Sequence, residues 1–216
     1  MSSIVWLEDN NYEFPPLEQA LTEPDGLIAA GGALSPEILL KAYRHGIFPW
    51  YSEGQPILWW SPDPRCVLFP DKLKVSRSLR KTLNKKRFVI KQDTVFRDVM
   101  LNCSRPRKNE AGTWITQDML DAYCHMHDLG YAHSVECWQH DELVGGLYGI
   151  ILGKMFFGES MFSIQADASK VALEYLCNTI QPKLIDVQVY SRHMASLGAE
   201  MIPRSEFIEY LDRYCE

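Results

Sequence analysis

The segment SVECWQHDELVGGLYGIILGKMFF, residues 134–157, determines the predicted fold of the second half of the chain. Apolar and β-branched residues favour strands over residues 134–138 and 143–152, and the polar residues between them indicate a hairpin turn. A third short strand is expected over residues 155–157. These strands predict a largely antiparallel sheet.

Helices are predicted before and after this segment. Thr116 precedes apolar residues at helical spacing, and Gly130 ends that pattern. Asp167 is placed to cap a later helix, Ser205 starts a last helix, and a β-branched strand over residues 184–190 lies between those two helices. We therefore expect an α+β domain with helices packed on the faces of the sheet.

The first third of the chain is rich in proline, glycine and tryptophan. Ser35 and Pro36 are suited to the N-cap and first turn of one short helix. The prolines in residues 48–65 exclude a central strand there, so we expect ordered loop and a short edge strand. The strand and helix pattern starts after this segment, which predicts a small N-terminal domain over residues 1–65 and a larger domain over residues 66–216.

The composition is that of a globular protein, since 46% of the 216 residues are hydrophobic and 23% are charged. The longest uncharged stretch in the apolar second half, residues 143–153, falls well short of the roughly 20 residues that cross a bilayer. No secretory signal opens the sequence, and the six cysteines form no C-x-x-C pair. These features predict reduced thiols, a cytoplasmic location and no membrane association.

Charge is distributed unevenly along the sequence. The whole chain has a formal net charge of −6, but residues 71–108 hold 13 Lys and Arg against three Asp. A basic segment on an acidic protein is typical of a face that binds nucleic-acid phosphates. A solvated helix followed by a Lys-rich turn has the same composition, so charge alone leaves both interpretations open.

Three polar side chains are embedded in apolar sequence. Asp186 and Gln188 interrupt the strand Leu-Ile-Asp-Val-Gln-Val, where residues two apart share a face, and Glu159 lies in the aromatic segment FFGESMF. Because buried polar groups need partners, Asp186 and Gln188 either bond each other and nearby backbone or line a pocket. Two acids in such surroundings favour a pocket that binds a cation or an amine.

Common nucleotide-binding and hydrolase motifs are absent, including G-x-x-x-x-G-K-[ST], G-x-G-x-x-G, G-x-S-x-G and H-E-x-x-H. His125 and His127 lie two residues apart on a predicted helix and face different sides, which disfavours a shared metal ion. We expect no metal and no cofactor.

Ten segments form a recognisable set. They are GLIAAGG (26–32), YRHGIFPWY (43–51), ILWWSPDPR (57–65), SRSLRK (76–81), GTWIT (112–116), ELVGGLYG (142–149), FFGESMFS (156–163), ASK (168–170), LIDVQV (184–189) and H-x-x-SLGA (193–199). Together they span nearly the whole chain, which resembles the leucyl/phenylalanyl-tRNA–protein transferases. The resemblance implies a small family-specific N-terminal domain followed by a domain of the GCN5-related N-acetyltransferase fold.

The resemblance also implies an activity. Members of this bacterial family transfer Leu or Phe, less often Met, from aminoacyl-tRNA to the N-terminal Arg or Lys of acceptor proteins, which marks those proteins for N-degron degradation. We expect a cytoplasmic monomer that acts on these two substrates without a cofactor.

The family pattern assigns roles to particular residues. Asp186 and Gln188 match the catalytic positions, Asp186 is expected to orient Gln188, and Glu159 helps to build the site. The substrate-binding positions are Trp50, Trp114, Leu147, Phe156, Leu176, Ser191 and His193. The tRNA contacts expected in the basic segment are Arg77, Arg80, Lys81, Lys85, Lys86 and Arg87.

Three positions depart from the family pattern. Leu147 replaces a methionine and Leu176 a phenylalanine, which keeps the pocket apolar but changes its depth and therefore its preference between Leu and Phe. Ser191 stands where an asparagine is expected, so one substrate contact is lost or runs through water.

Two alternatives remain. An acyl-CoA-dependent N-acetyltransferase shares the implied fold but needs a [QR]-x-x-G-x-[GA] pyrophosphate loop, and none follows the central strands. A non-catalytic RNA-binding module would have no use for a buried Asp-x-Gln. If the basic segment does not hold tRNA, Arg44, His45 and Arg65 are the next candidates.

Overall fold

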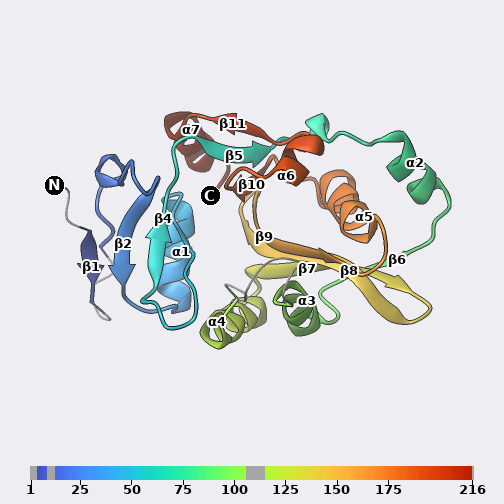
Figure 1. Cartoon of the computed structure of the whole chain (residues 1–216), viewed down its shortest axis with the longest axis horizontal. Coiled ribbons are helices and arrows are strands. Elements are labelled where there is room, and N and C mark those ends of the chain that lie inside the picture. Colours follow the sequence, from blue (N-terminus) through green and yellow to red (C-terminus); the bar gives the residue numbers. More distant parts are fainter. Residues whose placement is uncertain (1–3, 9–12, 106–114, 216) are drawn as a thin grey trace.

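The computed structural model describes residues 4–8, 13–105 and 115–215, which form two sheets and their helices (Figure 1). The smaller sheet has the strand order β1-β2-β4-β3. Its elements are β1 (Val5–Leu7), β2 (Leu27–Gly31), β3 (Phe48–Pro49) and β4 (Leu58–Trp60), with helix α1 (Pro36–Arg44) between β2 and β3 in sequence and a short 3-10 turn at Leu17–Gln19.

The larger sheet has the order β11-β5-β10-β9-β8-β7-β6, and its pairs are antiparallel except for the parallel pair β9 and β10. Its strands are β5 (Arg65–Leu68), β6 (Val89–Gln92), β7 (Ala132–Gln139), β8 (Glu142–Leu152), β9 (Met155–Ser163), β10 (Leu184–Gln188) and β11 (Glu200–Ile202). The predicted α+β class is therefore confirmed.

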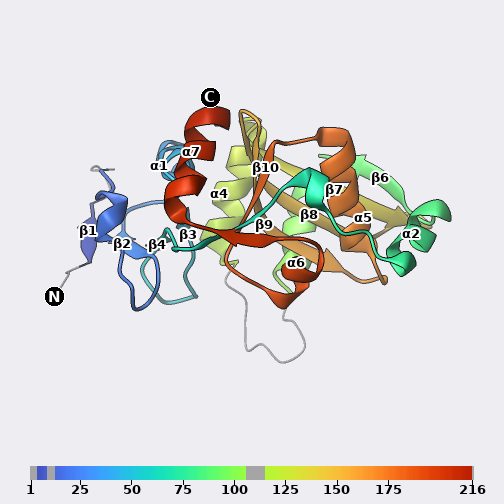
Figure 2. The same cartoon turned by 90° about the horizontal axis from the view of Figure 1, so that it is seen from above.

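Helices cover both faces of the larger sheet. Helices α3 (Phe96–Cys103) and α4 (Gln117–Asp128) lie on one face, and α5 (Ala168–Tyr175), continued by a π-helical turn at Leu176–Ile180, lies on the other (Figure 1). The remaining elements are α2 (Arg77–Asn84), α6 (Arg192–Ser196), α7 (Arg204–Tyr214) and a 3-10 turn at Pro70–Lys72. Figures 1 and 2 place the smaller sheet and α2 at opposite ends of the molecule.

The predicted strands are confirmed, with differences at their ends. The third strand, expected over residues 155–157, continues to Ser163 because it stays paired with β8. The proline-rich segment yields β3 at a sheet edge, as expected, but β4 lies inside the sheet between β2 and β3. Its residues Leu58–Trp60 contain no proline, so both of its sides can pair. The missed strands and helices, β1, β2, β5, β6, β11, α3 and α6, are each eight residues or shorter, whereas α2 is the helix considered for the basic segment.

Two of the four predicted helix starts are correct in detail; the other two differ in the cap of α5 and in the first residue of α7. Ser35 and Thr116 cap α1 and α4, and each hydroxyl accepts a hydrogen bond from a backbone N–H three residues on. Asp167 occupies the N-cap position of α5, but its carboxylate makes no capping hydrogen bond and its φ is 68°. Helix α7 begins at Arg204, one residue before the predicted Ser205.

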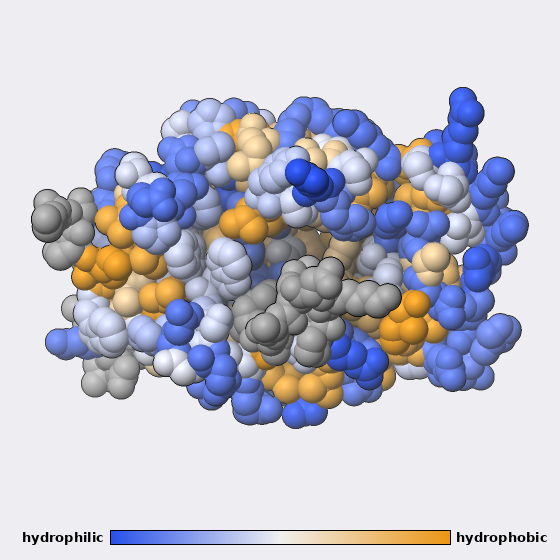
Figure 3. All heavy atoms as spheres, in the orientation of Figure 1, coloured by the Kyte–Doolittle hydropathy of each residue, from blue (hydrophilic) through white to orange (hydrophobic). Residues whose placement is uncertain are grey.

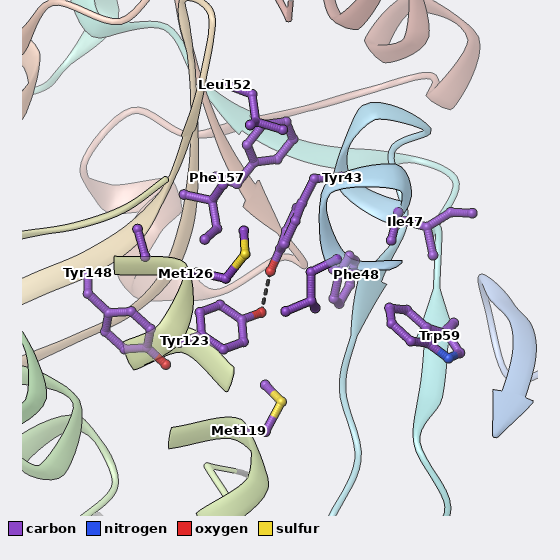
Figure 4. Packing of buried hydrophobic residues seen from close by; sticks show 14 of the residues in the cluster. Tyr43, Ile47, Phe48, Trp59, Met119, Tyr123, Met126, Tyr148, Leu152 and Phe157 are labelled. Carbon is purple, nitrogen blue, oxygen red and sulfur yellow. Dashed lines mark hydrogen bonds between the residues drawn. The ribbon is translucent and has the colours of Figure 1, made fainter. Parts of the chain in front are cut away.

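A buried apolar cluster joins the two sheets. It contains Trp59 of the smaller sheet, Tyr43 of α1, Tyr123 of α4 and Phe157 of the larger sheet. Figure 4 shows the hydroxyls of Tyr43 and Tyr123 pointing toward each other, and they form a hydrogen bond. Among the described residues, no helix is both long and apolar enough to span a membrane.

Strands β9 and β10 part soon after they meet. They pair only through Met155–Phe157 and Leu184–Asp186. Beyond this point β9 continues along β8, whereas β10 ends in a bulge at Gln188, whose φ of 69° is left-handed. Side chains, including those of Glu159 and Gln188, therefore line an opening between the two strands.

Gly145 allows α5 to pack closely on β8. A Cβ atom at Gly145 would lie 2.4 Å from the Cβ atom of Ala168. We expect Gly145→Ala to lower the free energy of unfolding by about 1–3 kcal/mol through overpacking, as measured by urea denaturation. Adding Ala168→Gly removes the clashing methyl group and should restore part of this loss; a double variant with no recovery would contradict this explanation.

Candidate active site

A cavity of about 1150 Å³ occupies the region where β9 and β10 part. This volume exceeds the roughly 300–1000 Å³ of common small-molecule pockets, so the cavity can hold a ligand with more than one chemical part. Apolar side chains from both sheet and helix contribute to its wall, and Glu159, Asp186 and Gln188 line it as well.

Six of the predicted substrate-binding residues line this cavity. Leu147 on β8, Phe156 on β9 and Leu176 in the π-helical turn after α5 are buried and pack in one apolar cluster. Trp50 is 42% exposed, and its ring centre lies 5.9 Å from that of Trp60. The last of the predicted pocket residues, Trp114, lies outside the described residues.

The other two of these six residues belong to α6. The hydroxyl oxygen of Ser191 accepts a hydrogen bond from the backbone N–H of Met194 at 3.1 Å and caps the helix. The group that replaces the expected asparagine is therefore engaged within the protein. His193 lies in the same short helix and is exposed.

Asp186 is fully buried and forms an ion pair with Arg65. Nε and Nη2 of Arg65 donate to Oδ1 and Oδ2 of Asp186 at 2.8 and 2.7 Å. Oδ1 also accepts the backbone N–H of Gln188 at 2.9 Å. Both interpretations of the sequence are correct in part, because Asp186 bonds the Gln188 backbone and both residues line a cavity.

Glu159 accepts hydrogen bonds from three side chains. Oε1 accepts from Gln188 Nε2 at 2.8 Å and from the Tyr43 hydroxyl at 2.7 Å, and Oε2 accepts from the Tyr123 hydroxyl at 3.2 Å. Removal from water raises the pKa of Glu159 to about 7; the charge of Asp186 adds to this effect, and the hydrogen bonds oppose it. This carboxyl group can therefore gain or lose a proton near neutral pH.

Sequence reasoning did not place Arg65, Tyr43 and Tyr123 in this site. Arg65 was considered as an alternative tRNA contact, which is wrong because its side chain is fully buried. A signal was present, since an arginine at the start of the apolar strand Arg-Cys-Val-Leu needs a buried partner. The partner, Asp186, lies 121 residues further along the chain.

The predicted tRNA contacts lie on a separate surface. All six residues are exposed, three on α2 and three in the turn that follows it. Figure 3 shows hydrophilic residues gathered at this end of the molecule. The hydroxyl of Thr82 on α2 donates to Asp167, a cavity-lining residue, at 3.2 Å, and Lys170 donates to the same carboxylate at 2.9 Å. This contact connects α2 to the cavity wall.

These features define a class of protein. A large cavity with apolar walls, next to a carboxyl group that titrates near neutral pH, is typical of an enzyme that binds an apolar group beside a reacting polar group. Within the part of the chain that the structure describes, no group of three or more His, Cys, Asp or Glu is arranged to hold a metal ion.

Comparison with known proteins identifies the family. The family model described as leucyl/phenylalanyl-tRNA protein transferase matches residues 67–212, and the model of its N-terminal domain matches residues 32–63. A leucyl/phenylalanyl-tRNA–protein transferase of Aromatoleum aromaticum is 58% identical over 94% of this chain and 87% of its own. A leucyl/phenylalanyl-tRNA–protein transferase of Pseudomonas aeruginosa is 55% identical over 98% of this chain and 95% of its own. The chain belongs to the leucyl/phenylalanyl-tRNA–protein transferase family, and its predicted enzyme class is confirmed.

Solved structures show a weaker likeness. A GCN5-related N-acetyltransferase from Kribbella flavida covers 80% of this chain and 61% of its own, with 10% identity and a TM-score of 0.40. L-PGS from Bacillus licheniformis covers 85% of this chain and 64% of its own, with 10% identity and a TM-score of 0.38. Scores this low do not assign a fold, so beyond the α+β class the expected N-acetyltransferase fold stays a prediction.

The raised pKa of Glu159 predicts a pH-dependent stability. The folded protein keeps this proton up to about pH 7, whereas the unfolded chain releases it near the ordinary value of 4.5, so Glu159 lowers stability as pH rises between these values. The Glu159→Gln variant cannot ionise at this position. Its free energy of unfolding should therefore rise relative to that of the wild type by up to about 3 kcal/mol as the pH increases from 5 to 8. Urea unfolding at both pH values measures the change. Glu142→Gln, at an exposed position, is the control, and equal pH dependence of Glu159→Gln and wild type would contradict the raised pKa.

Proposed function

We propose that this protein transfers Leu or Phe, and less often Met, from aminoacyl-tRNA to the N-terminal Arg or Lys of acceptor proteins and so marks them for N-degron degradation. Relatives named for the tRNA-dependent transfer are 55–58% identical to the chain. The observation that carries the proposal is the placement of Glu159 and Gln188 in one cavity with buried apolar side chains.

The apolar wall suits the aminoacyl group. Leu147, Phe156 and Leu176 offer a surface on which a Leu or Phe side chain loses its contact with water. The remaining cavity volume is available for the terminal adenosine of the tRNA and for the first residue of the acceptor.

The polar groups suit the chemistry of amide formation from an ester. The acceptor's α-ammonium must lose a proton before its nitrogen can attack. Gln188 donates its Nε2–H to Glu159, so the Oε1 atom of Gln188 can accept an N–H of the acceptor's amine. Glu159 takes the proton that the ammonium group loses, because its carboxyl group titrates near neutral pH. The nitrogen then bonds to the ester carbonyl carbon, the ester C–O bond breaks, and the second proton moves from nitrogen to the departing ribose oxygen.

The exposed Lys and Arg side chains of α2 and the turn that follows it are proposed to hold the acceptor stem of the tRNA. Their exposure and their connection to the cavity wall through Thr82 and Asp167 support this placement. A domain boundary near residue 65, a cytoplasmic location and a monomeric state belong to the same proposal. The smaller sheet ends at Trp60 and the larger begins at Arg65, in agreement with that boundary.

A transfer assay tests the proposed function. Labelled Leu, Phe and Met, each carried on tRNA, are offered with a peptide that begins with Arg, and labelled product is expected. Gln188→Ala should lower kcat at least about a hundredfold, as for other positioned proton-transfer groups, with the KM for charged tRNA unchanged. The exposed Gln92→Ala is the matched control. Label transfer from acetyl-CoA instead would favour the N-acetyltransferase alternative.

Charge reversal tests the tRNA surface. Arg80→Glu with Lys81→Glu should raise the KM for charged tRNA and flatten its dependence on salt by about one unit of slope for each phosphate contact removed. The control is Lys154→Glu with Lys183→Glu, which makes the same charge change at two exposed positions outside α2. Equal effects of the two pairs would mean that the tRNA is not held at α2.

A further inference from the structure

The guanidinium group of Arg65 is enclosed on several sides. Besides its two hydrogen bonds to Asp186, Nη1 donates to the backbone carbonyl of Gly46 at 3.1 Å. The ring centres of Phe48 and Phe207 each lie 4.7 Å from Cζ. These contacts come from the turn after α1, from β3 and from α7, so Arg65 has one fixed position relative to all three.

The position of Arg65 determines the position of Asp186. Both carboxylate oxygens accept from the guanidinium in a two-point contact, which restricts rotation of the carboxylate as well as its location. The negative charge of Asp186 is balanced within the protein. Asp186 is therefore suited to hold a neighbouring donor in place rather than to take a proton from the acceptor.

The donor that Asp186 holds is the backbone N–H of Gln188. Gln188 has a φ of 69°, a left-handed conformation that is unfavourable for a residue with a Cβ atom and persists where the surroundings maintain it. The 2.9 Å hydrogen bond from this N–H to Asp186 Oδ1 is such a constraint. In this conformation the Gln188 side chain reaches Glu159 at 2.8 Å.

We infer that Arg65 is a positioning residue for the transfer reaction: through Asp186 it maintains the left-handed backbone of Gln188 and thereby the place of the Gln188 amide in the cavity. This inference rests on the proposed function. A purely structural Arg65 would affect stability and the fraction of folded enzyme, whereas a positioning Arg65 also affects kcat of the folded enzyme.

The first test is Arg65→Lys, which keeps the charge but loses the two-point contact. We expect kcat per folded enzyme to fall about tenfold to a hundredfold, the effect of a misplaced reacting group, with the KM for charged tRNA unchanged. Arg204→Lys is the matched control. Arg204 donates to the backbone carbonyl of Ser61 at 2.6 Å and does not contact Asp186, so its kcat should stay within about twofold of wild type.

A second variant leaves Arg65 and the cavity lining intact. Phe207→Leu removes one of the two rings against the guanidinium and should lower kcat about fivefold through looser placement of Arg65. Phe69→Leu is its control, because Phe69 makes the same kind of contact with Lys72, whose partner is the exposed Glu200. This variant decides the question if Arg65→Lys does not fold.

The outcomes separate the inference from the proposed function. A wild-type protein that transfers Leu or Phe, together with folded Arg65→Lys and Phe207→Leu variants of unchanged kcat, would overturn the role of Arg65 alone. A fall in kcat in both variants, absent from Arg204→Lys and Phe69→Leu, supports it. A wild-type protein without transfer activity would overturn the proposed function and the inference with it.

Discussion

The buried ion pair between Arg65 and Asp186 is the interaction on which the arrangement of the site depends. Two charges removed from water are tolerated only when each is fully paired, and here each has hydrogen bonds beyond the pair itself. The pair joins β5 to β10 and, through Gly46, to the turn that follows α1. The site is therefore complete only when segments from distant parts of the chain have come together.

The second constraint is the separation of β9 from β10. Paired strands satisfy their backbone groups against each other, but beyond Phe157 and Asp186 the two strands have different neighbours or none. This separation creates an opening in the middle of a sheet, and the buried side chains of Leu147 and Leu176 contribute to its wall. It also removes Glu159 from bulk water while leaving it in contact with the cavity, which explains its raised pKa.

Local patterns in the sequence predicted the elements that depend on neighbouring residues. The hairpin of β7 and β8 and the caps of α1 and α4 were found because their signals lie within a few residues. Glu159, Asp186 and Gln188 were found because a polar residue in apolar sequence needs an explanation. Tyr43 looked like an ordinary core residue of a helix, since its partner Glu159 is 116 residues away. Asp167 looked like a cap, but its carboxylate is bound by Thr82 and Lys170 instead.

The concentration of positive charge at α2 gives the molecule an uneven electric field. Six of the chain's Lys and Arg lie on α2 and the turn that follows it, although the net charge of the chain is −6, so a polyanion is attracted to α2 more strongly than to the molecule as a whole. Such a field turns an approaching nucleic acid before contact and raises the rate of productive encounters. Its range is set by the Debye length, about 8 Å at physiological ionic strength. The association rate of this protein with a highly charged ligand is therefore governed by the ionic medium around it.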